Sequence, residues 1–207
     1  MFPVIYEEKD WLVIDKPAGV SVHNDQNSVI KHLPGYNPVH RLDKETSGLL
    51  LLSRESETTS RLQTALEKAQ KKYLCICRKV VSDDCGEWTQ ALSEAAGGYK
   101  SPQGPKNERK PCRTIWSLRS KNKFFSVLDV EIQSGRTHQI RRHALIAGHH
   151  IVGDKRYGDK KYNQMIISRY QTDRMFLHAT SLTFQFEERK IELLSPVPDD
   201  FSKMVEF

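Results

Sequence analysis

The feature that most constrains this fold is a run of four leucines, Leu49–Leu52, bounded by Gly48 and Ser53. An unbroken apolar run of this length predicts a strand buried on both faces, although the pattern alone does not distinguish it from a buried stretch of helix. The polar residues before the run, 40–48, must then leave the core at the mouth of a rigid strand. Loop residues held by such a scaffold often carry chemistry, so Asp43 is the first candidate carboxylate.

A purely structural interpretation of residues 40–48 competes with this one. Clusters of Ser, Thr, Asp and Gly before an apolar run are typical of ordinary turns, in which Asp43 or Thr46 would bond to backbone amides. On this stretch alone the turn interpretation is favoured, and only further motifs change the balance.

The length of the chain, 207 residues, fits one large domain or two small ones, and we expect a single domain over residues 1–207. No segment approaches the ~20 consecutive apolar residues of a membrane span. Residues 1–4 lack the basic and apolar regions of a secretory signal. We therefore expect a soluble cytoplasmic protein with no membrane partner.

Basic residues outnumber acidic ones by 32 to 26, for a formal net charge of +6 and a sequence pI near 9.1. The excess is concentrated in residues 100–123, which hold eight Lys or Arg against one acid, and in a second basic segment over 136–161. Two such segments suggest a basic face for a phosphate backbone, but a solvated surface would have the same composition. The candidates for phosphate contacts in the first segment are Lys106, Arg109 and Lys110.

The four cysteines, Cys75, Cys77, Cys85 and Cys112, do not have the spacing of a zinc site, because no two of them form a Cys-x-x-Cys pair. His149-His150 likewise lacks the His-Glu-x-x-His pattern of a helical metal site. The sequence therefore predicts no metal ion.

Runs rich in β-formers dominate the chain. Helices are predicted over 55–69 and 137–147, with at most one further turn near 28–33. Residues 82–110 favour a surface excursion with room for a small hairpin. Because the elements lack regular βαβ alternation, we expect an α+β domain with a mixed, largely antiparallel sheet and few helices. Strands are predicted over residues 5–6, 11–14, 20–23, 49–52, 71–77, 112–118, 124–132, 175–186 and 190–193.

The predicted helix over 137–147 divides its side chains by face. Its apolar residues Ile140, Ala144 and Ala147 share one face, which we expect to meet a core. Arg141 and Arg142 fall on other faces.

Four short motifs lie at predicted strand or turn ends. Individually each has an ordinary structural interpretation, with Tyr73 as a strand aromatic, Leu177 as a core residue and Arg136 as a surface charge. In this order and separation they resemble the pseudouridine synthases of the RluA type. The segments 15–19, 153–158 and 196–201 resemble that family too, so the likeness covers nearly the whole chain. The motifs are His40-Arg41-Leu42-Asp43, Lys71-Lys72-Tyr73, Gly135-Arg136-Thr137-His138-Gln139-Ile140-Arg141 and Phe176-Leu177-His178-Ala179.

The resemblance implies a catalytic domain, without an S4-like RNA-binding module, that isomerises a specific uridine to pseudouridine in structured ribosomal or transfer RNA. It implies Asp43 as the catalytic aspartate, Tyr73 as the active-site tyrosine and Arg141 as the basic partner of Asp43. No cofactor is expected for a redox-neutral isomerisation, and we expect a monomer with no obligatory protein partner. The substrate-binding residues would be His40, Arg41, Arg136, His138, Gln139, Ile140 and Leu177, the last as an apolar wall, with Lys106, Arg109 and Lys110.

The reaction needs groups of these types. Uracil must be detached, turned and rejoined through C5, and a carboxylate serves either as nucleophile toward the sugar or as base at its 2′ side. An ionised Asp in a closed pocket needs a cation, which Arg141 would supply. Tyr73 would stack on the base and relay the C5 proton. The target base must first leave its stack, and Arg41 and His40 would either fill the vacated space or hold the flanking phosphates.

Two other functions stay open at this point. A non-catalytic RNA-binding module or RNA chaperone would keep the basic face, but it has no need of a carboxylate among phosphate-binding cations. A metal-independent nuclease using His40, His138 or His178 would leave Asp43 and Leu177 without a role.

Overall fold

The computed structural model describes residues 1–23, 25–95 and 97–205, with side chains up to Met204. Asn24 and Ala96, which belong to two of the predicted loops, lie outside the described residues. The chain divides into two compact units: unit 1 is Met1–Lys72 with His178–Pro196, and unit 2 is Tyr73–Leu177 with Val197–Phe207.

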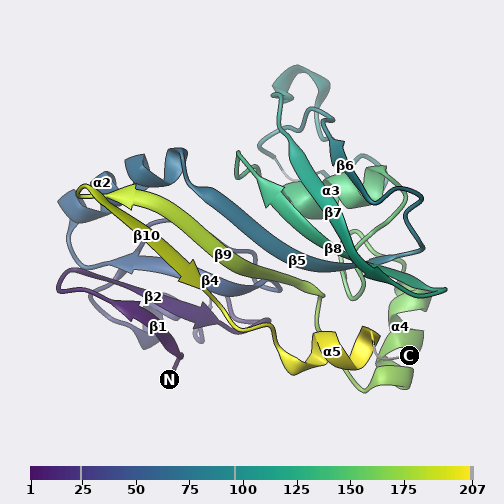
Figure 1. The fold of residues 1–207 in the computed structure, drawn as a ribbon, viewed down its shortest axis with the longest axis horizontal. Helices are drawn as coiled ribbons and strands as arrows, with labels where there is room; N and C mark the ends of the chain where they lie inside the picture. Colours follow the sequence, from purple (N-terminus) through teal and green to yellow (C-terminus); the bar gives the residue numbers. More distant parts are fainter. Residues whose placement is uncertain (24, 96, 206–207) are drawn as a thin grey trace. The chain divides into compact units, whose positions relative to one another are not determined.

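Among the described residues, ten strands form one mixed, mostly antiparallel sheet, which confirms the predicted fold class (Figure 1). Their order is β1-β2-β4-β9-β5-β8-β7-β6, with β10 paired to β9 and β3 to β4. The strands are β1 (Val4–Glu7), β2 (Trp11–Lys16), β3 (Asn37–Pro38), β4 (Ser47–Ser53), β5 (Gln70–Arg78), β6 (Cys85–Trp88), β7 (Thr114–Lys121), β8 (Phe125–Ile132), β9 (Leu177–Phe186) and β10 (Arg189–Leu194). The helices are α1 (Val29–His32), α2 (Ser56–Glu67), α3 (Gln139–Ile146), α4 (Lys160–Tyr170) and α5 (Asp199–Val205), with a 3-10 turn at Lys106–Glu108.

The leucine run is the centre of unit 1. All seven residues of β4 are buried, as predicted for a strand covered on both faces. β4 pairs antiparallel with β2 from Gly48 to Ser53 and parallel with β9 at Ser47 and Gly48. Leu49 and Leu51 join the core cluster to which α2 contributes Leu62 and Leu66.

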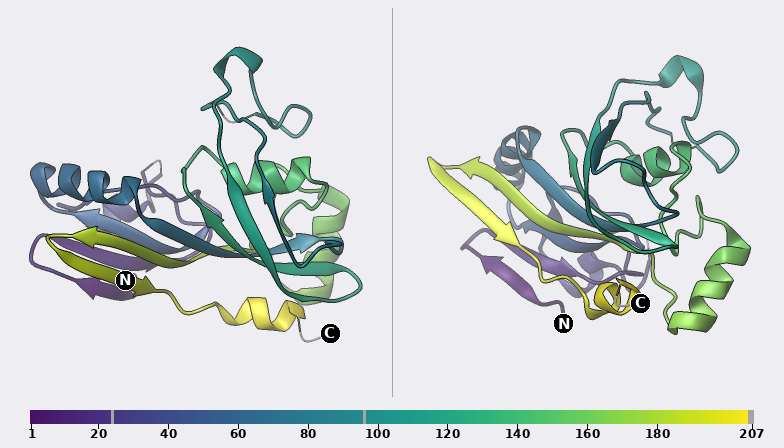
Figure 2. Two further views of the ribbon diagram at one scale, coloured as in Figure 1. Left: turned by 45° about the horizontal axis from the view of Figure 1, so that its top comes forward. Right: turned by 45° about the vertical axis from the view of Figure 1, so that its right-hand side comes forward.

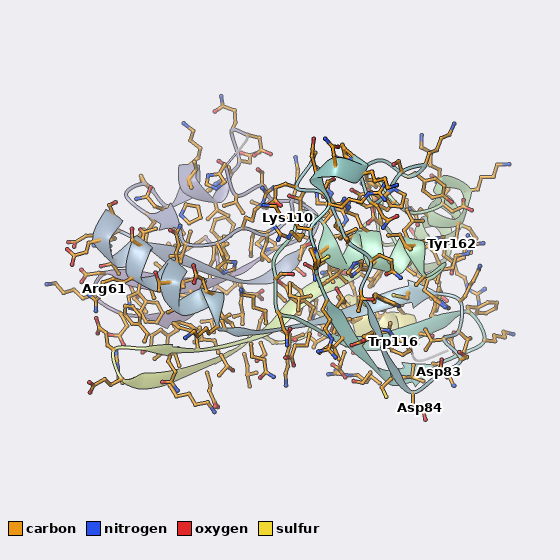
Figure 3. The ribbon with its side chains drawn as sticks, turned by 90° about the horizontal axis from the view of Figure 1, so that it is seen from above. Arg61, Asp83, Asp84, Lys110, Trp116 and Tyr162 are labelled. Atoms are coloured by element: carbon orange, nitrogen blue, oxygen red, sulfur yellow. The ribbon has the colours of Figure 1, made fainter. Side chains whose placement is uncertain are left out.

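Unit 2 is built on the antiparallel strands β6, β7 and β8. Helix α3 contacts β7, and its residues Ile140 and Ala144 enter a core cluster that also contains Trp116, labelled in Figure 3. A second cluster receives Ile166 from α4 and Phe201 from α5. Figure 2 shows these three helices in two further views. Apolar stripes on short helices therefore supply much of the burial in unit 2.

The structure corrects several local predictions. Residues 20–23 form no strand, and the carbonyl of Val20 instead accepts a hydrogen bond from Lys16 Nζ. Helices α4 and α5 lie where no helix or strand was predicted. In the 82–110 segment, β6 pairs with β7 instead of forming a local hairpin. On α3 the prediction for the faces is wrong in part, since Ala147 is exposed while Arg141 and Arg142 are buried.

Gly48 provides a test of how tightly β4 and β9 approach. It has a φ of +111°, and a Cβ at this position would collide with the backbone of Ala179 on β9. Gly19 has a φ of +84° but open space around its missing Cβ. Gly19→Ala should therefore lower the free energy of unfolding by about 1–2 kcal/mol through backbone strain alone. Gly48→Ala should lower it by more than about 3 kcal/mol, since a strand must also move.

Urea denaturation of the two variants beside the wild type measures the difference. Equal losses for Gly48→Ala and Gly19→Ala would contradict the close approach of the two strands.

Candidate functional site

Asp43 lies in unit 1, in the loop that leads into β4. The loop closes as a turn in which Thr46 N donates to the carbonyl of Asp43 at 3.1 Å. The neighbouring carbonyl of Lys44 accepts from Gly19 N at 2.8 Å. Asp43 is half-buried, and its place at the start of a fully buried strand is as predicted. The turn bonds run through the backbone, so they do not use the carboxylate.

A buried lysine that the sequence analysis did not single out anchors this turn. Lys16, at the end of β2, is 0% exposed, and its Nζ donates to the carbonyls of Pro17 at 3.0 Å, Val20 at 2.8 Å and Lys44 at 3.2 Å. A buried ammonium needs such acceptors to offset its desolvation. Lys16 thereby ties the 15–20 segment to the turn that carries Asp43. The sequence feature that could have indicated this anchor is the Lys16-Pro17 pair at the end of a predicted strand.

His40 braces β4. Its Nε2 accepts the backbone N–H of Leu51 at 3.1 Å, which requires the unprotonated nitrogen. Desolvation, together with the positive charge of Lys71, lowers the pKa of His40 from 6.5 to about 4. The ring is therefore neutral at neutral pH and offers no cation to a phosphate, whereas Arg41 beside it is exposed.

His178 is fully buried in unit 1. Its Nδ1 is hydrogen-bonded to Ser47 Oγ at 2.9 Å, and the two residues are partners in the parallel pairing of β9 with β4. A nuclease base has to reach solvent-accessible RNA, so this position disfavours the nuclease alternative for His178.

Unit 2 brings together three of the predicted apolar and aromatic residues. Ile140 on α3 and Leu177 on β9 are 4% and 3% exposed and belong to one core cluster. Tyr73 on β5 is half-buried and packs against the same cluster. The residue after Ile140, Arg141, is 3% exposed.

The guanidinium of Arg141 forms a buried, two-pronged ion pair with Asp154. Its Nε donates to Asp154 Oδ2 at 2.7 Å and its Nη2 to Oδ1 at 3.0 Å. The backbone amides of Arg156 and Tyr157 also donate to Oδ1, each at 2.9 Å. Burial by itself raises the pKa of Asp154, but the bonds and charge of Arg141 and the two amides outweigh it and hold that pKa below its usual value. Two parallel bonds fix the plane of the Arg141 guanidinium.

Helix α4 holds the turn that carries Asp154. Asn163 Nδ2 donates to the Asp154 carbonyl at 2.9 Å, and Asn163 Oδ1 accepts from Gly153 N at 3.2 Å. The helix begins at Asp159, whose side chain caps the N–H of Tyr162 at 3.0 Å. The predicted motif 153–158 thus contains a site residue, Asp154, whose function as the partner of Arg141 the sequence analysis missed.

Gln139 and His138, predicted to bind substrate, have structural partners. Gln139 is buried, and its Nε2 donates to Arg113 O at 2.9 Å and Thr114 Oγ1 at 3.0 Å. His138 starts α3 with a φ of 54°, and its Nδ1 is hydrogen-bonded to the hydroxyl of Tyr157 at 3.0 Å.

The basic segment 100–123 is anchored by a second buried arginine, Arg142, whose Nε donates to the carbonyl of Pro102. Its Nη1 donates to Ser93 O at 2.9 Å and to Thr137 O at 3.0 Å. Within this segment, Arg109 Nη2 donates to the carbonyl of Gly104 at 2.7 Å. The predicted phosphate-binding residues therefore differ in kind, because Arg109 organises the loop while Lys106 and Lys110, the latter labelled in Figure 3, are exposed.

Arg136 makes an ion pair of 3.5 Å with Glu94 of the same unit. Within the described parts of the chain there is no cluster of three or more His, Cys, Asp or Glu able to hold a metal ion. No helix in the same described residues is long and apolar enough to cross a membrane.

The family model for RNA pseudouridylate synthases matches residues 10–145, about two thirds of the chain. The chain belongs to the RNA pseudouridylate synthase family. The match includes Asp43 and Arg141 and confirms the resemblance inferred from the motifs. This pseudouridine synthase is therefore an enzyme that isomerises uridine in RNA.

Curated relatives and solved structures agree with this assignment. A ribosomal large subunit pseudouridine synthase C from Buchnera aphidicola (subspecies Schizaphis graminum) is 30% identical over 94% of this chain and 67% of its own length. The protein of the same name from Escherichia coli K12 is 32% identical over 87% of this chain and 61% of its own length. The chain thus spans about two thirds or less of these relatives.

Two human structures share the fold. Human RNA pseudouridylate synthase domain containing 1 superposes with a TM-score of 0.81, 24% identity, and coverage of 96% of this chain and 84% of that one. Human RNA pseudouridylate synthase domain containing 4 superposes with a TM-score of 0.80 and 21% identity, and the match covers 99% of this chain and 92% of that one.

The lowered pKa of His40 predicts a pH dependence of stability. In the unfolded chain His40 takes up a proton near pH 6.5, but in the folded chain only near pH 4. Its contribution to stability is therefore complete above pH 6.5 and declines as the pH falls toward 4, with a slope of about 1.4 kcal/mol per pH unit. His40→Gln, whose amide oxygen still accepts from Leu51 N–H, should unfold with a correspondingly shallower pH dependence.

Urea denaturation between pH 7 and pH 4 measures this slope, and His32→Gln, at an exposed histidine on α1, is the matched control. A His40→Gln profile parallel to the wild-type profile would show that folding does not lower the pKa of His40.

Proposed function

We propose that this pseudouridine synthase modifies a uridine of large-subunit ribosomal RNA. The observation that carries the proposal is that the curated relatives which match 87–98% of the chain are all named ribosomal large subunit pseudouridine synthase C. These relatives are bacterial and are named for the large ribosomal subunit, which supports a cytoplasmic location for the proposed reaction. The enzyme would act as a monomer, with RNA as its partner and no obligatory protein partner.

Asp43 is the proposed catalytic carboxylate. One support is the His-Arg-Leu-Asp motif. The other is the turn that carries Asp43, which is held by backbone hydrogen bonds and by Lys16 on the Lys44 carbonyl, so that these bonds do not depend on the Asp43 carboxylate. A carboxylate at a rigid strand mouth suits either nucleophilic attack on the sugar or proton abstraction at its 2′ side.

Arg141 is the proposed basic partner of Asp43. The pair with Asp154 supports this role, because it engages Nε and one terminal nitrogen and so holds the guanidinium in one orientation. A fixed cation lowers the cost of an ionised carboxylate and needs no reorganisation during the reaction. Asp154 would then be a positioning residue that acts through Arg141.

Tyr73, Leu177 and Ile140 are proposed to form the dry surface against the uracil. Their shared core cluster supports this, because packed side chains present a fixed apolar wall. Tyr73 is the half-buried member, so its ring is the one suited to stack on the base, and its phenol would relay the C5 proton.

The grip on the RNA backbone is assigned to exposed cations. Arg41, Lys106 and Lys110 are exposed and suit phosphate contacts, whose strength falls with added salt. Arg136 is half-buried beside Glu94, and phosphate would compete with that exposed carboxylate. His40, Gln139, His138 and Arg109 would support the site through the protein contacts described above.

Release of tritium from ribosomal RNA labelled at uracil C5 tests the reaction and the role of Asp43 together. The RNA is taken from cells lacking this protein. Wild-type enzyme should release tritium without cutting the strand, and Asp43→Asn should lower the rate at least roughly a thousandfold while binding RNA nearly as well, because the amide is neither a nucleophile nor a base. Asp25→Asn, at a half-buried acid that pairs with Lys44, is the matched control and should remain active.

Retained turnover by Asp43→Asn would overturn the catalytic assignment. Release from transfer RNA alone would overturn the ribosomal substrate, and binding without release from either RNA would favour the non-catalytic module.

A further inference from the structure

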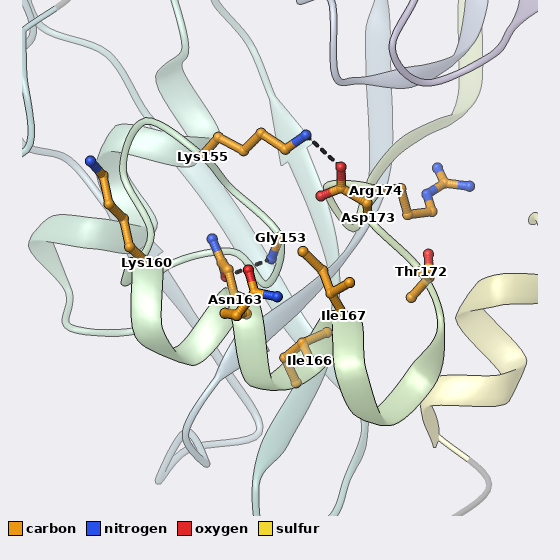
Figure 4. A pocket seen from close by; sticks show the side chains of 10 residues that line it. Gly153, Lys155, Lys160, Asn163, Ile166, Ile167, Thr172, Asp173 and Arg174 are labelled. Carbon is orange, nitrogen blue, oxygen red and sulfur yellow. Dashed lines mark hydrogen bonds and ion pairs between the residues drawn. The ribbon is translucent and has the colours of Figure 1, made fainter.

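Unit 2 contains a pocket of about 280 Å³ between α4 and the segments that precede and follow it (Figure 4). The volume lies at the lower end of the ~300–1,000 Å³ range of ligand pockets, so it suits one small ligand unit. None of the residues proposed for the isomerisation lines this pocket.

One wall of the pocket is apolar. Ile166 is 1% exposed, and Ile167, the next residue of α4, is partly exposed. In Figure 4 the side chain of Ile167 points toward the Lys155–Asp173 pair. Thr172 adds a hydroxyl to the lining. A small apolar wall beside hydrogen-bonding groups accepts a flat ring more readily than it accepts a bare anion.

The rim of the pocket carries two exposed lysines, Lys155 and Lys160. Lys155 Nζ lies 2.8 Å from Asp173 Oδ2, with side chains 61% and 59% exposed. An ion pair this exposed is worth little, so an incoming phosphate would replace Asp173 at small cost. Arg174 is committed elsewhere, because its guanidinium pairs with Asp200 at 3.9 Å and lies over the ring of Phe201.

We propose that this pocket binds one unstacked nucleotide of the RNA, as a subsite distinct from the uridine that reacts. The base would lie on Ile167, and the phosphate would displace Asp173 from Lys155. The inference rests on the proposed function only in taking RNA as the substrate. An apolar wall beside an exposed cation suits an unstacked nucleotide, because an extruded base packs on apolar side chains and its phosphate is held by a basic one.

The pocket also adjoins the turn that carries Asp154, the ion-pair partner of Arg141. Gly153 and Asn163 line it, and the same two residues form the hydrogen bonds that hold the Asp154 turn. A bound nucleotide would therefore stiffen the turn whose carboxylate orients Arg141. RNA held here would favour the guanidinium orientation that the reaction needs.

Titration with adenosine 5′-monophosphate tests the subsite directly, because a purine nucleotide is not the reacting base. Three variants accompany the wild type: Ile167→Trp fills the pocket, Asp173→Asn removes the competing carboxylate, and Met165→Trp adds the same ring at an exposed position of α4. Ile167→Trp should weaken binding at least about tenfold, and Met165→Trp should leave it unchanged. Asp173→Asn should tighten binding up to about fivefold, the size of a lost surface ion pair, but should not tighten the binding of adenosine, which lacks the phosphate.

The same variants are then compared in tritium release from RNA. Ile167→Trp should raise KM while Met165→Trp does not, with thermal unfolding showing that both are folded. No nucleotide binding by the wild type, or an equal response of Ile167→Trp and Met165→Trp, would overturn the subsite even if the enzyme is active. Nucleotide binding with this variant pattern but no tritium release from any RNA would support the subsite and refute the proposed function instead.

Discussion

The buried ion pair between Arg141 and Asp154 is the interaction on which the rest of the candidate site depends. An arginine that is 3% exposed needs acceptors that offset its desolvation, here the Asp154 carboxylate, and removal of one partner of such a pair typically costs about 3–5 kcal/mol. Asp154 in turn needs the Arg156 and Tyr157 amides and the bonds of Asn163 to the turn. The cation is therefore part of a network that extends from α3 to α4, and its orientation is set before any RNA binds.

Unit 1 uses a related device for Asp43. There the ammonium of the buried Lys16 donates to three carbonyl oxygens and so closes the loop at the mouth of β4. Both units thus place a charged side chain of a short motif in the interior to shape a neighbouring turn. Segments 15–19 and 153–158 therefore stabilise the geometry of the residues proposed to act on RNA, and substitutions there should change rates without removing a reacting group.

The sequence predicted those parts of the fold that depend on local pattern. Leu49–Leu52 predicted a buried strand, and β4 is that strand because both its faces are apolar. The pattern of α4 was too weak to predict a helix, since among its residues with described burial only Asn163 and Ile166 are buried and one of these is polar. The Arg141–Asp154 pair was not predictable from spacing, because it forms across a turn that Asn163 closes from another element. The roles of Asp43, Tyr73 and Arg141 stay predictions from the motifs.

We propose that Asp154 orients Arg141 for catalysis. The most direct test is the single-turnover rate of Asp154→Asn with saturating enzyme, measured below the unfolding temperature of the variant, together with its affinity for the same RNA. We expect a rate about 10- to 100-fold below wild type with RNA affinity nearly unchanged, because an amide keeps the shape of the side chain but not the charge that fixes the guanidinium. A wild-type rate in a folded Asp154→Asn enzyme would contradict the claim.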